Sequence, residues 1–171
     1  MNQLKRALIW LGRIGHCRGF GIQSPTDYAF VRNVVNEHSP YYAYDELGRN
    51  DNWLDRKLGK LYLRLANQRQ PRTISAYGHT DWLMAGCKKA RMLSANQPAD
   101  LMIAARPTDA LPLLPQCTED AMLVVERIAD DCHTWQQIVD SEQAVVSFDL
   151  YYCGIVFFDK KRYKHHYIVN F

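Results

Sequence analysis

Residues 73–78 read Thr-Ile-Ser-Ala-Tyr-Gly, a short apolar run that ends at a glycine. Two similar runs follow, Leu-Met-Ile-Ala at 101–104 and Ala-Met-Leu-Val-Val at 121–125. Helical patterns lie beside them at 80–89 and 131–140. Short apolar runs that alternate with helices are typical of βαβ units and a parallel sheet. The sequence therefore predicts an α/β fold from residue 72 onward.

The end of the chain carries three more strand-like runs, at 144–149, 154–158 and 166–171. Their short links favour antiparallel neighbours, and the charged stretch 159–164 is expected to form a hairpin loop between the last two runs. The predicted sheet is thus parallel with antiparallel C-terminal strands.

A helical N-terminal segment is expected over residues 1–71, ahead of the sheet. Leucines at helical spacing predict a helix over 2–14, which we expect to dock on the protein's own core; a helix lying on a membrane surface is the alternative. Ser24 and Pro25 predict the start of a second helix, since serine caps free amides and proline suits the first turn. A third helix is predicted by the spacing of Leu54, Leu58, Leu61 and Leu65.

Composition bounds the class of protein. The chain has 171 residues, 47% of them hydrophobic and 23% charged, which fits one compact unit in which 1–71 pack on 72–171. No apolar run approaches the roughly 20 residues of a membrane-spanning helix. Five cysteines without a Cys-x-x-Cys pair favour neither a zinc site nor a disulfide framework, so we expect reduced thiols in a cytoplasmic protein.

Positive charge gathers in the first part of the chain. Residues 1–72 carry 12 Lys/Arg against 6 Asp/Glu, a net of +6, whereas residues 73–171 carry 9 against 12, a net of −3. Cations neutralise phosphates and rings stack on bases, so one hypothesis is an anionic ligand or nucleic acid bound by this part. The alternative is a solvated helical surface with tyrosines in the core, and we expect no nucleic-acid partner. The residues of the hypothesis are Lys5, Arg6, Arg13, Arg18, Tyr41, Tyr42 and Tyr44.

Two clusters of chemistry-bearing residues have structural explanations. The stretch Asp130-Asp131-Cys132-His133 could hold a metal ion, but it also opens a predicted helix, where aspartates cap amides and suit the helix dipole. His165 and His166 follow a basic stretch in a predicted turn, and neighbouring residues of a strand point to opposite faces, so we expect no joint ligand role for them. We expect no metal site and no catalytic residue.

Several stretches carry a resemblance to a known family. The chain resembles bacterial class I S-adenosylmethionine-dependent methyltransferases with an N-terminal helical extension, common in Bacteroidetes. The matching stretches include Gly21-Ile22-Gln23-Ser24-Pro25, Tyr41-Tyr42-Ala43-Tyr44-Asp45-Glu46 and Gly154-Ile155-Val156-Phe157-Phe158. The resemblance implies a shortened Rossmann-like sheet that holds the methyl donor at the carboxyl ends of its first strands.

The departures from that family concern the donor site. After the first strand the family has an acidic residue and a glycine-rich turn, whereas this chain has Tyr77, Gly78 and His79. No carboxylate follows the second strand, and the linker 95–99 is too short for the helix and strand that a complete fold inserts. Glu126 and Arg127 stand where the family has an aspartate pair.

These losses lead to three hypotheses. The first is a degenerate methyltransferase-like protein, a pseudoenzyme that binds no cofactor and acts as a scaffold or binding module, with a protein partner or a second copy of itself. Any residual pocket would then involve Tyr77, Gly78, His79 and Glu126. The second is an active enzyme whose S-adenosylmethionine is anchored by Glu126, Asp109 or Asp100. The third is the anionic-ligand hypothesis given above.

Overall fold

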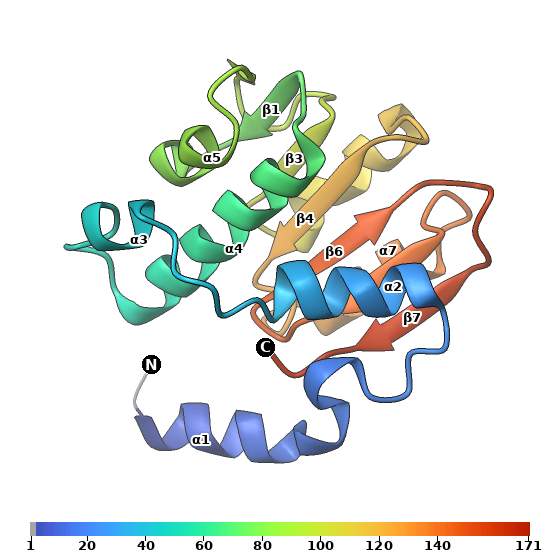
Figure 1. Cartoon of the computed structure of the whole chain (residues 1–171). Coiled ribbons are helices and arrows are strands. Elements are labelled where there is room, and N and C mark those ends of the chain that lie inside the picture. The colour runs from blue at the N-terminus through green and yellow to red at the C-terminus, as the bar shows by residue number, and fades with distance from the viewer. Residues whose placement is uncertain (1–2) are drawn as a thin grey trace.

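The computed structural model describes residues 3–171 and has a seven-stranded sheet between layers of helices (Figure 1). The expected α/β class is confirmed, with a mixed and mostly parallel sheet. The strand order is β2-β1-β3-β4-β6-β5-β7. The strands are β1 (Thr73–Ala76), β2 (Arg91–Leu93), β3 (Leu101–Ala104), β4 (Met122–Glu126), β5 (Val146–Asp149), β6 (Cys153–Phe157) and β7 (His165–Ile168).

Some of the helices begin at a side-chain cap that the sequence provides. Ser24 Oγ accepts a hydrogen bond from the Asp27 amide at 3.4 Å, and Asn52 Oδ1 accepts one from the Leu54 amide at 2.9 Å. The helices are α1 (Gln3–Gly12), α2 (Pro25–Phe30), α3 (Ala43–Glu46), α4 (Trp53–Arg69), α5 (Thr80–Gly86), α6 (Pro107–Ala110) and α7 (Cys132–Asp140). Three further helical stretches are η1 (Ile14–Gly19), η2 (Val31–Val35), which continues α2, and η3 (Leu111–Gln116).

The predicted C-terminal hairpin is wrong. Strand β6 pairs antiparallel with β4 on one side and with β5 on the other, so it has no free edge for β7. The loop 159–164 carries the chain past β5, and β7 pairs parallel with the outer edge of β5. Only β6 among the strands of residues 3–171 therefore runs against the others, and the C-terminal strands are not a simple antiparallel set.

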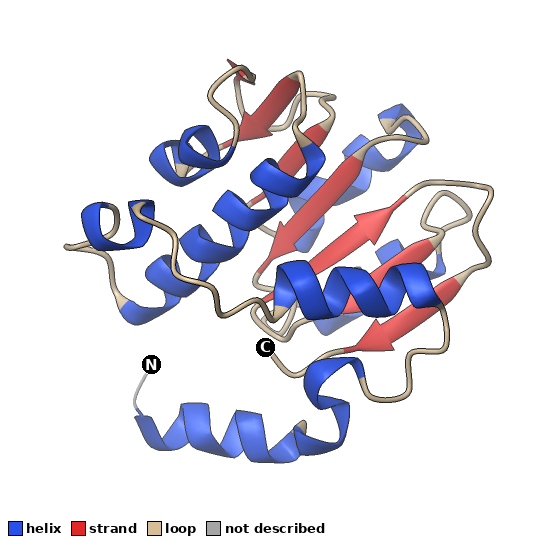
Figure 2. Ribbon diagram, viewed as in Figure 1, coloured by secondary structure: helices blue, strands red, loops and turns tan. Residues whose placement is uncertain are grey.

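The helices cover both faces of the sheet (Figure 2). One face packs against η2, α4 and α5 through a core that includes Leu61, Ile74 and Phe148. The other packs against α6, η3 and α7 around residues such as Leu123 and Ile138. Side chains alternate along a strand, so Met122, Val124 and Glu126 of β4 face the side that α4 covers.

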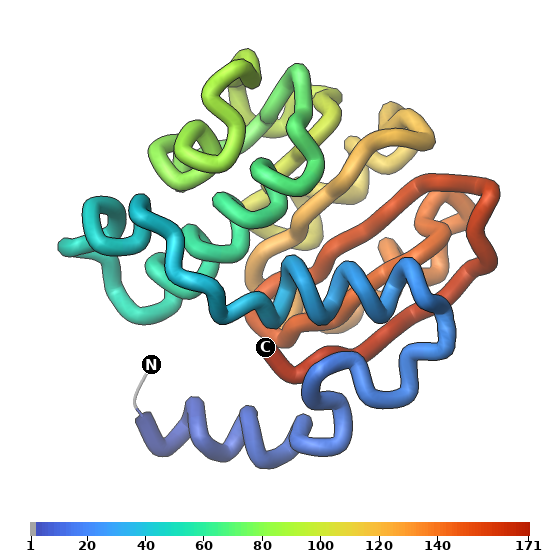
Figure 3. Tube along the Cα trace, in the orientation of Figure 1, coloured from blue at the N-terminus to red at the C-terminus, as the bar shows by residue number. Residues whose placement is uncertain are grey.

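Helix α1 does not dock its apolar stripe, contrary to expectation. Leu4, Leu8 and Leu11 are 69%, 61% and 55% exposed, and α1 runs apart from the two helical layers (Figure 3). The segment is tied down by polar contacts instead. Arg13 pairs with Asp149 at 2.6 Å, and the side-chain amide of Asn170 donates to the Trp10 carbonyl at 3.1 Å. The predicted start of this helix at residue 2 lies outside the described residues.

The length and hydropathy of these helices bear on whether one of them could cross a membrane. No helix within residues 3–171 is both long enough and apolar enough to span a lipid bilayer.

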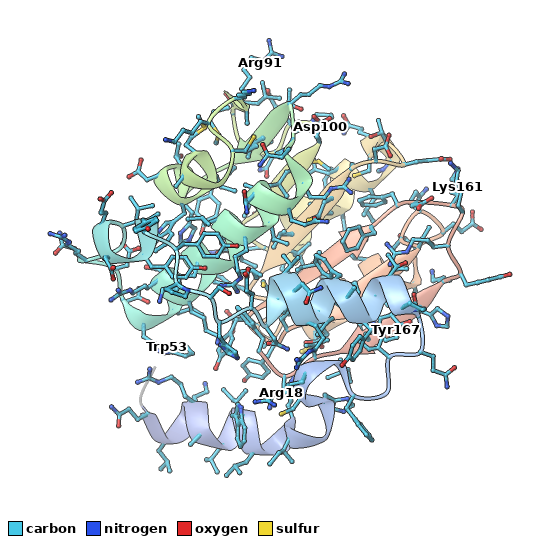
Figure 4. The ribbon with its side chains drawn as sticks, viewed as in Figure 1. Arg18, Trp53, Arg91, Asp100, Lys161 and Tyr167 are labelled. Atoms are coloured by element: carbon cyan, nitrogen blue, oxygen red, sulfur yellow. The ribbon has the colours of Figure 1, made fainter. Side chains whose placement is uncertain are left out.

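The connection from β2 to β3 is short, as the sequence predicts. Residues 94–100 form no helix or strand and carry the chain past β1 to its other side. Asp100 fixes the end of this connection, because its Oδ2 accepts hydrogen bonds from the amides of Arg72 and Thr73 at 2.8 and 3.1 Å. Asp100 therefore lies at the amino end of β1 (Figure 4).

Candidate functional site

The strand order reverses at β1, which pairs with β2 on one side and β3 on the other. Ligands of doubly wound sheets bind at the carboxyl ends of the strands beside such a reversal. Here that edge brings together the loop after β1 and the end of β4, with α4 above them. This edge of the sheet is therefore the first candidate for a ligand-binding site.

A hydrogen-bonded cluster lies at this edge, around Glu126. The Tyr62 hydroxyl donates to Glu126 Oε1 at 2.6 Å, and the Tyr77 hydroxyl donates to Oε2 at 3.1 Å. His79 Nε2 lies 3.8 Å from Oε1, and the His79 ring meets the Tyr62 ring edge-on with centroids 5.1 Å apart. Glu126 is 4% exposed, so both of its oxygens are satisfied by the protein itself.

Four elements hold the Glu126 cluster in place. Tyr62 comes from the buried face of α4, and Glu126 is the last residue of β4. Tyr77 directly follows β1, and His79 begins α5 in the left-handed region at φ 58°. The conformation at His79 is uncommon for a residue with a Cβ, and it sets the direction in which the chain enters α5.

The electrostatics of the cluster favour neutral phenols beside a carboxylate. Burial, and next the nearby Glu126 carboxylate, raise the pKa of Tyr62 well above its usual value. The same two causes raise the pKa of Tyr77. Each tyrosine thus keeps its proton and donates a hydrogen bond to Glu126, which ties the loop after β1 to α4 and β4.

The structure brings together three of the four residues expected at a residual pocket. Tyr77, His79 and Glu126 meet, whereas Gly78 faces away from them into open space, since a Cβ there would meet nothing within 4 Å. Sequence analysis did not identify Tyr62, which makes the shortest hydrogen bond to Glu126. Its place four residues after Leu58 in the apolar stripe of α4 suggested only a core residue.

The other carboxylates considered as anchors of a methyl donor lie elsewhere. Asp100, one of the three anchors in the hypothesis of an active enzyme, is at the opposite edge of the sheet and bound to backbone amides, so it lies away from Glu126. Asp109 lies in α6, which covers the other face of the sheet from α4 and Glu126. Asp131 caps α7 by accepting a hydrogen bond from the Thr134 amide at 3.0 Å, which confirms the helix-start interpretation of 130–133.

His165 and His166 also have separate surroundings. His165 stacks on Tyr167, while His166 Nδ1 lies 2.8 Å from Ser147 Oγ. Within residues 3–171 no three His, Cys, Asp or Glu side chains are grouped so as to hold a metal ion.

A second candidate site is a cavity of about 1010 Å³ between α1, the start of α4 and the last residues of the chain; we call it the α1–α4 cavity. Six basic residues and two acidic residues line it. Four of the seven residues in the anionic-ligand hypothesis are part of the lining, namely Arg6, Arg18, Tyr41 and Tyr44. The basic residues are Arg6, Arg18, Arg56, Lys57, Lys60 and Arg64, and the acidic ones are Glu37 and Asp45.

Two other members of that hypothesis lie outside the lining of the cavity. Arg13 is bound to Asp149, and Tyr42 is 96% exposed. The sequence analysis also missed Lys57, the basic residue closest to the aromatic wall of the cavity, because it is one polar position among many on α4. Trp53 and Arg18 both lie on the side of α1 that faces the rest of the molecule (Figure 4).

Comparison with known proteins gives no family: no protein-family model, no curated protein and no solved structure matches this chain.

Proposed function

We propose that this protein is a non-catalytic binding module, a degenerate relative of class I methyltransferases whose sheet has lost its place for S-adenosylmethionine. The observation that carries the proposal is the Glu126 cluster. Both carboxylate oxygens accept hydrogen bonds from Tyr62 and Tyr77 at the edge where a methyl donor would bind. Because Glu126 is also 4% exposed, a ligand could reach this carboxylate only after the side chains that cover it move apart.

The neighbouring strand ends offer the donor no substitute. The ribose hydroxyls of a nucleoside need an acceptor of the carboxylate type, and β2 is followed by Ser94 and Ala95. The Ser94 carbonyl already accepts a hydrogen bond from Ser75 Oγ at 2.8 Å. Beyond β3 the chain continues with Ala105 and Arg106, which add no acceptor side chain. The residues present therefore do not fit the methyl donor.

The size of the effect follows from the bonds that would be lost. A hydrogen bond to a charged group contributes about 1.5–3 kcal/mol. A ligand that displaced both tyrosines without making equivalent hydrogen bonds would lose about 3–6 kcal/mol, which weakens its binding by roughly 10²- to 10⁴-fold. We expect a cofactor of micromolar affinity in a complete site to become millimolar or weaker.

Calorimetric titration of the purified chain tests the proposal. S-adenosylmethionine and S-adenosylhomocysteine should give dissociation constants weaker than about 1 mM. A constant of about 100 μM or tighter would overturn the proposal, and loss of that binding in Glu126→Gln would identify Glu126 as the anchor. Transfer of a labelled methyl group to components of a cell extract would overturn it as well. Glu119→Gln, on the exposed loop before β4, is the matched control.

A further inference from the structure

The α1–α4 cavity has a surplus of positive charge that the chain does not neutralise. Its six basic residues face two carboxylates. The three ion pairs within residues 3–171 use Arg13, His79 and Arg162, none of which lines the cavity. With Glu37 already accepting a hydrogen bond from the Tyr41 hydroxyl at 2.8 Å, the cavity is a concave region of net positive charge.

Two of the basic residues are committed to the fold. Arg64 is 6% exposed and donates to the carbonyls of Val34 and Val35 at 2.6 and 2.9 Å, which holds the end of η2 against α4. Arg56 donates to the Tyr44 carbonyl at 3.1 Å. The cations that remain for a ligand are Arg6, Arg18, Lys57 and Lys60.

Aromatic rings hold three of these cations in position. The Lys57 ammonium lies 4.0 Å from the centre of the Phe171 ring and 5.5 Å from that of Trp53. The Arg6 guanidinium lies 4.5 Å from the Trp53 ring, and Lys60 lies 4.6 Å from the Tyr44 ring. Cation–π contacts fix the place of a charge without neutralising it, so the cations stay able to bind an anion.

Two buried donors beside the cavity lack an acceptor. Arg6 Nε and Asn36 Nδ2 are both buried, both belong to residues that line the cavity, and neither makes a hydrogen bond within the described part of the chain. Lys57 is mostly removed from water, and burial together with the charge of Arg64 lowers its pKa to about 8. Buried donors and charges are costly unless an acceptor compensates them.

We propose that the α1–α4 cavity binds a small molecule that carries a phosphate group, with Lys57 and Arg6 as its main cationic contacts. A phosphate supplies the several acceptor oxygens and the double negative charge that suit four available cations, whereas a single carboxylate would leave most of them unpaired. The cavity volume of about 1010 Å³ also accommodates a molecule of nucleotide size.

This inference rests on the proposed function only in taking the chain to be a binding module, and its ligand is chemically different from the methyl donor. S-adenosylmethionine carries no phosphate. The two titrations therefore fail independently: tight binding of the methyl donor overturns the proposed function, and a failure of the phosphate probes overturns only the present inference.

The experiment uses the full chain and three phosphate-bearing probes: inorganic phosphate, pyrophosphate and adenosine 5′-monophosphate. Adenosine serves as the probe without phosphate. Binding is followed by calorimetry and by the fluorescence of tryptophan, since Trp10 and Trp53 line the cavity. We expect at least one phosphate-bearing probe to bind with a dissociation constant below about 1 mM, and adenosine to bind far more weakly.

Variants assign the binding to the cavity. Lys57→Gln should weaken it by about thirtyfold or more, because truncating one partner of a desolvated charge pair leaves the other unpaired. Lys89→Gln removes the same charge from an exposed position in the turn between α5 and β2 and should change nothing. Arg18→Gln tests the same cavity from an exposed side chain, so its effect does not depend on whether the Lys57 variant folds.

Several outcomes would overturn the inference. One is the absence of saturable binding of all three phosphate-bearing probes, and another is equal affinity of wild type and Lys57→Gln. Binding of adenosine as tight as that of its monophosphate would show that phosphate is not the recognised group. Binding of a single-stranded RNA oligonucleotide with steep salt dependence, together with no binding of the small probes, would assign the surface to nucleic acid instead.

Discussion

Removing the Tyr62 hydroxyl tests whether the Glu126 cluster stabilises the fold. Tyr62 is fully buried and donates to Glu126 Oε1 at 2.6 Å. The substitution Tyr62→Phe keeps the ring but leaves one buried carboxylate oxygen without its phenol. Since a hydrogen bond to a charged group contributes about 1.5–3 kcal/mol, the free energy of unfolding should fall by that amount. For a chain of this size the melting temperature should fall by about 3–12 °C.

A double-mutant cycle makes this prediction specific to the pair. Replacing both partners with apolar groups of similar shape can be nearly neutral, so adding Glu126→Met should recover part of the loss. Tyr77→Phe should cost less, because Tyr77 is 51% exposed and water can replace its hydroxyl. Tyr163→Phe, at an 86% exposed residue, is the control and should leave stability unchanged.

Urea unfolding at pH 7, followed by circular dichroism, provides the free energies of the cycle. A Tyr62→Phe variant as stable as wild type would refute the argument, since it would mean that the buried carboxylate does not depend on this hydroxyl. Additive effects of the two substitutions would refute it too, because they would show that the residues are energetically independent.

Three further perturbations follow from particular contacts. Asp27→Ala should destabilise the fold by about 3 kcal/mol, because Asp27 is 2% exposed and its loss strands the guanidinium of Arg162; thermal unfolding measures this, and an unchanged melting temperature would contradict it. Lys57→Met should remove a rise in the free energy of unfolding with pH. Burial and the charge of Arg64 lower the pKa of Lys57 in the folded protein to about 8 from 10.5, so the unfolded chain binds more protons between those pH values. The free energy of unfolding of the wild type should therefore increase by up to about 3 kcal/mol over that window relative to the variant. Urea unfolding at pH 7.5 and 10 checks this, and parallel pH profiles for the two proteins would disprove it. Leu8→Asp should leave the free energy of unfolding nearly unchanged, because the Leu8 side chain is 61% exposed. Leu61→Ala, at a fully buried position, should lower it by about 2–5 kcal/mol. A large loss of stability in Leu8→Asp would show that α1 packs more tightly than the structure describes.

The site was only partly accessible to sequence reasoning. Tyr77, His79 and Glu126 could be singled out because each follows or ends a predicted strand, and strand ends of such sheets gather at one edge. Tyr62 and Lys57 could not, because both lie on α4, and the leucine spacing fixes which face of a helix is buried but not which strand end that face meets.

Local chemistry in the sequence determined the elements: the apolar period and the Ser24 cap set helices and strands within a few residues, since these signals depend on near neighbours along the chain. Only the tertiary structure decided which strands pair, that β7 adds to the outer edge of β5, and that the leucines of α1 face solvent. Strand pairing and helix docking depend on contacts between residues far apart in the chain. The link 159–164 would allow β7 to pair with either β6 or β5, and β7 pairs with β5 because both edges of β6 are already paired.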